Sequence, residues 1–343
     1  MKKSLILFLI VGITLSCSKK YDETIPQQFV GNAIGTTYGI QLFHKEQLDI
    51  TDDVQDIIDL FNESMSTWVP DSKINQINAG DSTVVVGEAF KEVFDYAKQV
   101  YADTDGYFDP TVGNLVNAYG FGADGRKEKA PDSLQIDSLM QYVGFDKMNL
   151  KTISDGYQVS STQSGMYLEF NAIGKGTLVD YIARILDKKG VENYLVEVGG
   201  EVIAKGRNLE RDAIWLVGVN APKKSKIGET MSLMALNLKD KAMAGSGNYR
   251  KFKLDEESGQ EYVHTVNPLT GKAVPSSVIA VNVVADNCTL ADGYATAFMA
   301  MPLDQSKQLL PRLTHIEVLI MYLDEYGILR FEKTAGFDAY VKK

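Results

Sequence analysis

Positive charge is in short supply in this sequence. The net charge is −10, the pI is near 5.0, and lysine and arginine form no basic stripe. Nucleic acid is therefore not an expected partner. The chain also lacks internal repeats and low-complexity segments. Its 343 residues, 45% of them hydrophobic, are enough to bury a large core, either as one domain or as two lobes.

Cysteine is scarce as well, since only Cys17 and Cys288 are present. Cys17 follows a basic start and an apolar run, Leu5 to Val11, that is too short to span a bilayer comfortably. The sequence Thr14-Leu15-Ser16-Cys17 is similar to a bacterial lipobox. It predicts a signal peptide over residues 1–16, lipidation of Cys17 by palmitate, and export. An ordinary signal peptide with an incidental cysteine is the alternative.

Lipidation of Cys17 leaves Cys288 as the last thiol, so no disulfide within the chain is expected. Residues 17–29 are largely polar and are predicted to be a lipidated tether. Residues 30–343 are predicted to form the folded domain.

Two patterns predict secondary structure along this domain. Apolar residues at helical spacing predict helices, and alternating β-branched or aromatic residues predict strands. The predicted helices cover residues 51–65, 88–102, 133–142, 289–301 and 303–313. The predicted strands include a hairpin at 149–161, a long strand at 277–285 and a closing pair at 318–323 and 327–331.

The stretch from Glu169 to Asp180, E-F-N-A-I-G-K-G-T-L-V-D, is the most informative local motif. An apolar run before it, residues 166–168, predicts a strand, and helical spacing follows up to Gly190. The glycine turn between them leaves backbone N–H groups unpaired at a helix start, and Lys175 adds a full positive charge. This favours an anion site, such as one for a phosphate. A connection whose glycines only make the turn has the same sequence.

Asp292 and Thr296 lie four residues apart on the predicted helix at 289–301, so they project from one face. A carboxylate and a hydroxyl placed in this way can ligate a hard cation such as Mg²⁺. They can equally form a hydrogen bond on the helix surface.

Other residues are open to two interpretations in the same way. Trp68 can anchor a core or offer a platform to a flat ring. Asp109, followed by proline, can be the N-cap of a short helix or a ligand-binding carboxylate. His264 is one of only three histidines, and a lone histidine on a strand is usually structural. Gly245-Ser246-Gly247 can be a second phosphate loop or a small-residue turn.

Taken in chain order, these motifs resemble the ApbE family, the FAD:protein FMN transferases. The resemblance covers residues 30–331, nearly all of the predicted mature chain. The matching blocks are Gly35-Thr36-Thr37-Tyr38, Met65-Ser66-Thr67-Trp68, Tyr107-Phe108-Asp109-Pro110-Thr111-Val112-Gly113, Ala172-Ile173-Gly174-Lys175-Gly176, Gly199-Gly200-Glu201, Ser246-Gly247-Asn248-Tyr249, His264 with Pro268, and Ala291-Asp292 with Thr296.

Several positions depart from the family pattern. Ile34 stands where methionine is usual, Glu169-Phe170-Asn171 replaces Asp-Leu-Gly, and Asn267 replaces an aspartate. Gly174 and Asn248 are further departures. We expect these changes to alter affinity or target preference more than reaction type.

The resemblance implies an α+β fold with mixed sheets, packed helices and two intimately associated lobes, with the active site in the cleft between them. It implies transfer of FMN from FAD to a Ser or Thr hydroxyl of a partner flavoprotein, with release of AMP. The implied partners are acceptor flavoproteins of exported or membrane redox systems, and the implied location is a membrane surface facing the periplasm. The alternatives are an FAD pyrophosphatase and a lipoprotein that only binds flavin.

The family's site residues correspond to particular positions of this chain. The resemblance implies that Asp292, Thr296 and the backbone carbonyl of Ala172 bind Mg²⁺. It makes His264 the candidate general base and Lys175 a catalytic cation for the phosphates. The positions implied to contact FAD are Ile34, Trp68, Tyr107, Phe108, Asp109, Glu169, Lys175 and His264.

Overall fold

The computed structural model describes residues 24–125, 127, 129–224, 230–248, 252–254 and 259–343. The predicted signal peptide, Cys17 and most of the predicted tether lie outside the described residues, as does Tyr249. No helix within these ranges has the length and apolar character needed to cross a membrane.

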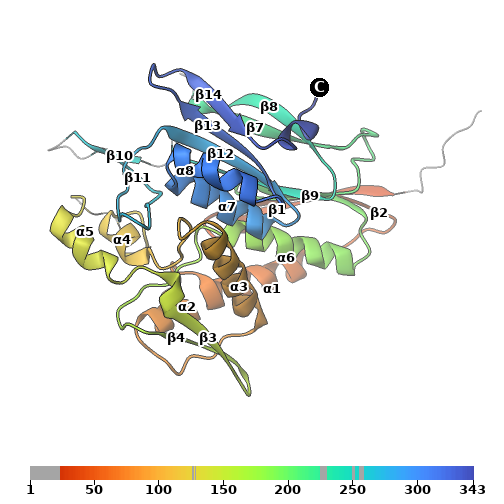
Figure 1. Cartoon of the computed structure of the whole chain (residues 1–343). Coiled ribbons are helices and arrows are strands. Elements are labelled where there is room, and N and C mark those ends of the chain that lie inside the picture. Colours follow the sequence, from red (N-terminus) through yellow and green to blue (C-terminus); the bar gives the residue numbers. More distant parts are fainter. Residues whose placement is uncertain (1–23, 126, 128, 225–229, 249–251, 255–258) are drawn as a thin grey trace, which may run out of the picture.

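An eight-stranded sheet forms the centre of the molecule (Figure 1). Mixed sheets were expected, but every pair of neighbouring strands in this sheet runs antiparallel. In spatial order the strands are β1 (Ile25–Ala33), β2 (Thr36–His44), β5 (Asn193–Val198), β6 (Glu201–Lys205), β9 (Lys241–Gly247), β12 (Val278–Ala285), β13 (Glu317–Leu323) and β14 (Leu329–Lys333).

Helices cover one face of this sheet and a hairpin covers the other. Helices α6 (Gly174–Lys188) and α7 (Cys288–Ala300) lie on the sheet and against each other, while α1 (Thr51–Met65) packs on α6 and α3 (Glu88–Asp103) on α7. The opposite face carries the hairpin of β7 (Trp215–Lys224) and β8 (Thr230–Leu238), drawn above the sheet in Figure 1.

Strand β12 shows why both faces must be covered. Its side chains alternate, so that Val281 and Val283 join the core under the helices, and Ala280 and Val284 join the core under the hairpin. A strand buried on both faces is apolar along most of its length, as the sequence V-I-A-V-N-V-V-A shows.

A smaller region packs beside the helical layer. It contains α2 (Lys73–Asn78), α4 (Gly113–Ala118), α5 (Ser133–Met140), the hairpin of β3 (Met148–Ile153) and β4 (Gly156–Ser161), and the hairpin of β10 (Phe252–Leu254) and β11 (Glu261–Val263). Helix α8 (Leu303–Leu309) and the 3-10 turns η1 (Phe145–Lys147), η2 (Leu310–Arg312) and η3 (Phe337–Ala339) complete the elements. One continuous core cluster joins Phe145 and Val159 of the smaller region to Val283 of the sheet. This arrangement confirms the predicted α+β class.

Local predictions failed in three places. The predicted tether is too long at its C-terminal end, because β1 begins at Ile25 and pairs with β2 along its whole length. Residues 166–168 do not form a strand, and Tyr167 makes only an isolated bridge to Val112. Gly245-Ser246-Gly247 is no phosphate loop, because it lies inside β9 and pairs with β12.

Candidate functional site

The start of α6 and the first turns of α7 come unusually close together. A Cβ atom on Gly176 would lie 2.2 Å from the carbonyl oxygen of Cys288, so only glycine fits at this position. The close approach lets the backbone N–H of Gly176 donate a hydrogen bond to Oδ2 of Asp292, at 3.0 Å. The glycines of the predicted anion-binding turn therefore also join two helices.

Lys175, Glu201 and Asp292 form what we call the carboxylate cluster. Nζ of Lys175 lies 2.8 Å from Oε1 of Glu201 and 3.6 Å from Oδ1 of Asp292. Both carboxylates are almost completely buried, with only 2% of each residue exposed. The cluster holds two acidic groups and one basic group, an excess of negative charge when all three are ionised, and the Lys175 side chain is 33% exposed.

The surroundings change the proton affinity of all three groups. Burial raises the pKa of Asp292, and burial together with the charge of Asp292 raises the pKa of Glu201. Burial on its own would lower the pKa of Lys175, but Asp292 and Glu201 outweigh it and raise that pKa. Lys175 is therefore a permanent cation in this cluster.

Thr296 and Ala172 extend the cluster with two uncharged oxygens. Oγ1 of Thr296 donates a hydrogen bond to the carbonyl oxygen of Ala172, at 3.3 Å, and Thr296 lies one helical turn beyond Asp292. Across the described ranges, no three His, Cys, Asp or Glu side chains gather as a metal site. A carboxylate, a hydroxyl and a carbonyl do suit Mg²⁺, which takes few protein ligands and keeps several waters.

One further observation shows that the cluster fits a cation. Oε2 of Glu201 is buried and has no hydrogen-bond partner. A buried carboxylate oxygen without a donor is costly, and such an orphan points to a missing positive or donor group. The oxygen donors and the excess negative charge therefore match the expected Mg²⁺.

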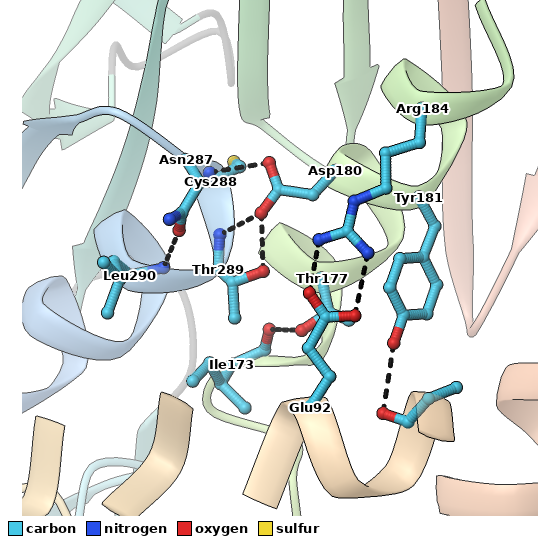
Figure 2. A network of polar contacts seen from close by, with 11 residues as sticks. Glu92, Ile173, Thr177, Asp180, Tyr181, Arg184, Asn287, Cys288, Thr289 and Leu290 are labelled. Atoms are coloured by element: carbon cyan, nitrogen blue, oxygen red, sulfur yellow. Dashed lines mark hydrogen bonds and ion pairs between the residues drawn. The ribbon is translucent and has the colours of Figure 1, made fainter. Parts of the chain in front are cut away.

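Another carboxylate, Asp180 of α6, is buried nearby in a different environment (Figure 2). It accepts hydrogen bonds from the backbone N–H of Cys288 at 2.8 Å, and from the N–H and hydroxyl of Thr289 at 2.8 and 2.6 Å. Burial raises the pKa of Asp180, while these hydrogen bonds oppose the rise. Asp180 therefore ties α6 to the start of α7, and both of its oxygens are used.

Glu169 lies just before α6, where the chain crosses to the smaller region. Only 8% of Glu169 is exposed, and this burial raises its pKa to about 7. The side-chain N–H of Asn171 donates to Oε2 of Glu169 at 3.0 Å and to Oγ1 of Thr67 at 3.3 Å. Asn171, which stands where the family has glycine, thus forms hydrogen bonds with Glu169 and Thr67.

The Phe-Asp-Pro block is bound into the fold in a way that the sequence did not predict. Asp109 is not the N-cap of α4, which begins four residues later at Gly113. Its Oδ1 accepts from the N–H and hydroxyl of Thr111 at 2.7 and 2.6 Å, and its Oδ2 from the N–H of Phe145 at 3.2 Å. Burial raises the pKa of Asp109 to about 6.

The rings of this block differ in accessibility. Phe108 is a core residue with 2% exposure, whereas Tyr107 is partly buried against the same core. Trp68 is 61% exposed, which removes the core-anchor interpretation. It lines a pocket of about 390 Å³ together with Thr67, Asn78, Asp124 and Tyr167.

Ile34 occupies the turn between β1 and β2. Its φ is 41°, a left-handed conformation that is strained for a β-branched residue. The turn borders a second pocket of about 590 Å³, lined also by Thr36 and by Gln55 and Asn62 of α1. The strained residue therefore packs against the core and also lines a hollow.

His264 follows β11 directly and is partly exposed. Its segment is fixed by Asn267, whose side-chain N–H donates to the carbonyl oxygen of Ala300 at the end of α7, at 3.0 Å. An aspartate at 267 has no N–H for this bond, so the departure from the family pattern has a structural reason.

Sequence reasoning gave no role to Glu201. The signal available was the Gly199-Gly200 pair before it, because φ values of 59° and 105° mark a tight turn that begins β6 at Glu201. A Cβ atom on Gly199 would lie 3.1 Å from Cδ of Lys175, so the turn also leaves room for that side chain.

The fold and the cluster define an α+β protein in which two buried carboxylates and a lysine meet where two helices approach each other. Residues 34–320 match the family model described as the ApbE family. This match spans most of the chain, and the protein belongs to the ApbE family.

Named relatives agree with this assignment. The FAD:protein FMN transferase of Haemophilus influenzae is 29% identical over 332 residues, covering 94% of each chain. That of Vibrio cholerae serotype O1 is 28% identical, covering 91% of this chain and 92% of the relative.

Solved structures agree as well. The flavin transferase ApbE from Vibrio cholerae superposes with a TM-score of 0.80 at 27% identity, covering 92% of this chain and 99% of the other. The apo flavinyl transferase ApbE from Pseudomonas stutzeri gives a TM-score of 0.78 at 26% identity, covering 92% and 97%.

Proposed function

We propose that this protein is an FAD:protein FMN transferase that depends on Mg²⁺. The observation that carries the proposal is the meeting of Lys175, Asp292, Thr296 and the carbonyl of Ala172 at the start of α6. A module that only binds flavin has no need for a buried oxygen site beside a permanent cation. The relatives that share the fold over nearly the whole chain carry the name of this activity.

In the proposed reaction, the hydroxyl oxygen of a Ser or Thr on the acceptor attacks the phosphorus that carries riboflavin. The bond from this phosphorus to the bridging oxygen breaks, and AMP leaves with that oxygen. The acceptor proton passes to a base, for which His264 is the candidate. Such transfer depends mainly on positioning and on charge stabilisation.

The residues of the cluster would divide the electrostatic work. Asp292, Thr296 and the carbonyl of Ala172 would hold Mg²⁺, which when bound offsets negative charge on the phosphates. Lys175 and the N–H groups at the start of α6 attract the same phosphates. Glu169, Trp68 and Tyr107 are the candidates for holding the rest of FAD.

Incubation with FAD, Mg²⁺ and a candidate acceptor tests the proposal. Flavin bound covalently to the acceptor, seen as added mass, together with free AMP supports the transferase. AMP without flavin on any acceptor indicates an FAD pyrophosphatase, and neither product indicates a flavin-binding protein. EDTA should stop the reaction and added Mg²⁺ restore it; activity that survives EDTA would remove the metal requirement.

We also propose that the protein acts outside the cytoplasm, anchored by lipid on Cys17 and facing the periplasm. The lipobox-like sequence at residues 14–17 supports this proposal, and acceptors would then be exported or membrane-bound redox flavoproteins. Mass spectrometry of the N-terminal peptide from the host membrane tests it. An unmodified Cys17 in the mature protein would contradict it.

A further inference from the structure

Glu201 touches the proposed metal site only through another residue. Its Oε1 lies 2.8 Å from Nζ of Lys175, whereas the same nitrogen is 3.6 Å from Oδ1 of Asp292. The first contact is a hydrogen-bonded ion pair, and the second is an ion pair that is too long for a hydrogen bond. The Lys175 ammonium is therefore held on the Glu201 side of the cluster.

Two features of the hairpin between β5 and β6 fix this position. Glu201 is the first residue of β6, directly after the tight Gly199-Gly200 turn, and pairs with Val198. The absence of a side chain on Gly199 leaves the space through which Lys175 passes, since a Cβ there would meet its Cδ at 3.1 Å. Strand β6 thus fixes the position of the Glu201 carboxylate, and Gly199 leaves room for Lys175 to reach it.

The position of the ammonium matters because Lys175 and a metal compete for Asp292. Oδ2 of Asp292 accepts a hydrogen bond from the N–H of Gly176, and Oδ1 faces the lysine. An ammonium in direct contact with Oδ1 would neutralise Asp292 and repel a divalent cation. Glu201 offers the ammonium a second partner in the same buried space.

We propose that Glu201 is a positioning residue that draws the Lys175 ammonium away from Asp292, so that Asp292 is free to take a divalent cation. The inference rests on the metal site of the proposed function. Glu201 holds the lysine through Oε1, while its buried Oε2 has no hydrogen-bond partner. With a metal bound, the same contact keeps the ammonium inside the site, where it can meet an anion.

A double-mutant cycle read from metal binding tests this role. Mn²⁺ replaces Mg²⁺ as an electron paramagnetic resonance probe, and the purified protein is free of FAD. In the presence of Lys175, Glu201→Gln should weaken Mn²⁺ binding about tenfold, because the lysine then pairs with Asp292. Lys175→Met should tighten Mn²⁺ binding, and in that background Glu201→Gln should weaken it less than about threefold.

The matched control is Glu197→Gln on the same hairpin. Glu197 accepts a hydrogen bond from the N–H of Gly200 and belongs to β5, so the variant removes one negative charge outside the cluster. It should leave Mn²⁺ affinity within about twofold of the parent protein. Glu201→Asp, which withdraws the carboxylate by one methylene, serves if Glu201→Gln does not fold, and should also weaken Mn²⁺ binding.

An equal loss of Mn²⁺ affinity from Glu201→Gln with and without Lys175 would overturn the inference, because Glu201 would then act on the metal directly. Absence of Mn²⁺ binding by the parent protein, or no loss in either Glu201 variant, would also overturn it. A protein that shows the coupling but transfers no FMN would leave this inference standing and contradict only the proposed function.

Discussion

Helices α6 and α7 hold each other through two buried carboxylates that are used differently. Asp180 of α6 accepts from the first residues of α7, and Asp292 of α7 accepts from Gly176 in the first turn of α6. Each helix thus places a negative charge at the positive end of the other, where the helix dipole stabilises it.

The two carboxylates differ in how many hydrogen bonds their oxygens accept. Asp180 receives two N–H groups and one hydroxyl, so both of its oxygens are engaged by neighbouring protein groups. Asp292 receives one N–H group, and its other oxygen faces an ammonium shared with Glu201. Burial of a carboxylate therefore does not indicate a functional site by itself. Incomplete hydrogen bonding in a buried, charged setting is the feature on which the proposed metal site rests.

Removal of the Asp292 carboxylate should impair activity and leave stability almost unchanged. Asp292→Ala is expected to lower the rate of FMN transfer at least about a thousandfold, because the proposed metal site would lose its charged ligand. The free energy of unfolding should change little, since a like charge beside Glu201 also disappears. Transfer kinetics and urea unfolding measure both quantities. Asp292→Asn, which keeps the acceptor for Gly176, separates charge from hydrogen bonding; retained transfer in both variants would remove Asp292 from the site.

Removal of the Asp180 carboxylate should lower stability and leave metal affinity almost unchanged. Asp180→Ala leaves three buried donors of Cys288 and Thr289 without an acceptor, so the free energy of unfolding should fall by roughly 4 kcal/mol. Mn²⁺ affinity of the folded fraction should stay near the parent value. Asp180→Asn keeps one acceptor oxygen and should lose less stability. A stable Asp180→Ala protein with weakened metal binding would reverse the two roles.

Glu169 offers a third buried carboxylate whose effect should depend on pH. Its pKa rises from 4.5 to about 7 on folding, so the native state holds the proton more tightly than the unfolded chain. Stability contributed by this group is therefore lost as pH rises from about 4.5 through 7, by ~3 kcal/mol. Glu169→Gln should be more stable than the parent at pH 8 and similar at pH 4.5. Urea unfolding at both values measures this, and a pH-independent difference would contradict it.

Gly176→Ala should weaken the contacts of Asp180 and Asp292 between α6 and α7, with a smaller loss of stability than Asp180→Ala. The added Cβ would meet the carbonyl oxygen of Cys288 at 2.2 Å and Cβ of Asp292 at 2.8 Å, so the helices must separate. We expect a loss of about 2 kcal/mol in the free energy of unfolding and weaker Mn²⁺ binding. Gly87→Ala tests glycine replacement without crowding, because nothing lies near its Cβ position and its φ of −96° is open to alanine; equal losses in both variants would show that crowding is not the cause.

Local patterns predicted the elements that bury one clear face. The amphipathic helices α1 and α3 and the hairpin of β3 and β4 lie where their periodicity placed them. The failures occurred where tertiary contacts override local preference. Gly245 to Gly247 form a strand because they pair with Ala280 to Asn282 of β12, and the small residues of β9 let α7 lie directly on it. Asp109 turns its oxygens to Thr111 and Phe145 and not to a helix start.

The sequence by itself determined the family of this protein and most of its candidate site. The order and spacing of the motifs around Asp109, Lys175 and Asp292 are linear properties of the chain, so they could be read without coordinates. Only the tertiary structure decided which buried carboxylates are satisfied. Asp180 and Asp292 are alike in sequence terms, each an acidic residue on an apolar helix. Their difference arises from groups over a hundred residues away, Thr289 for one and Lys175 for the other, and such contacts exist only in the folded chain.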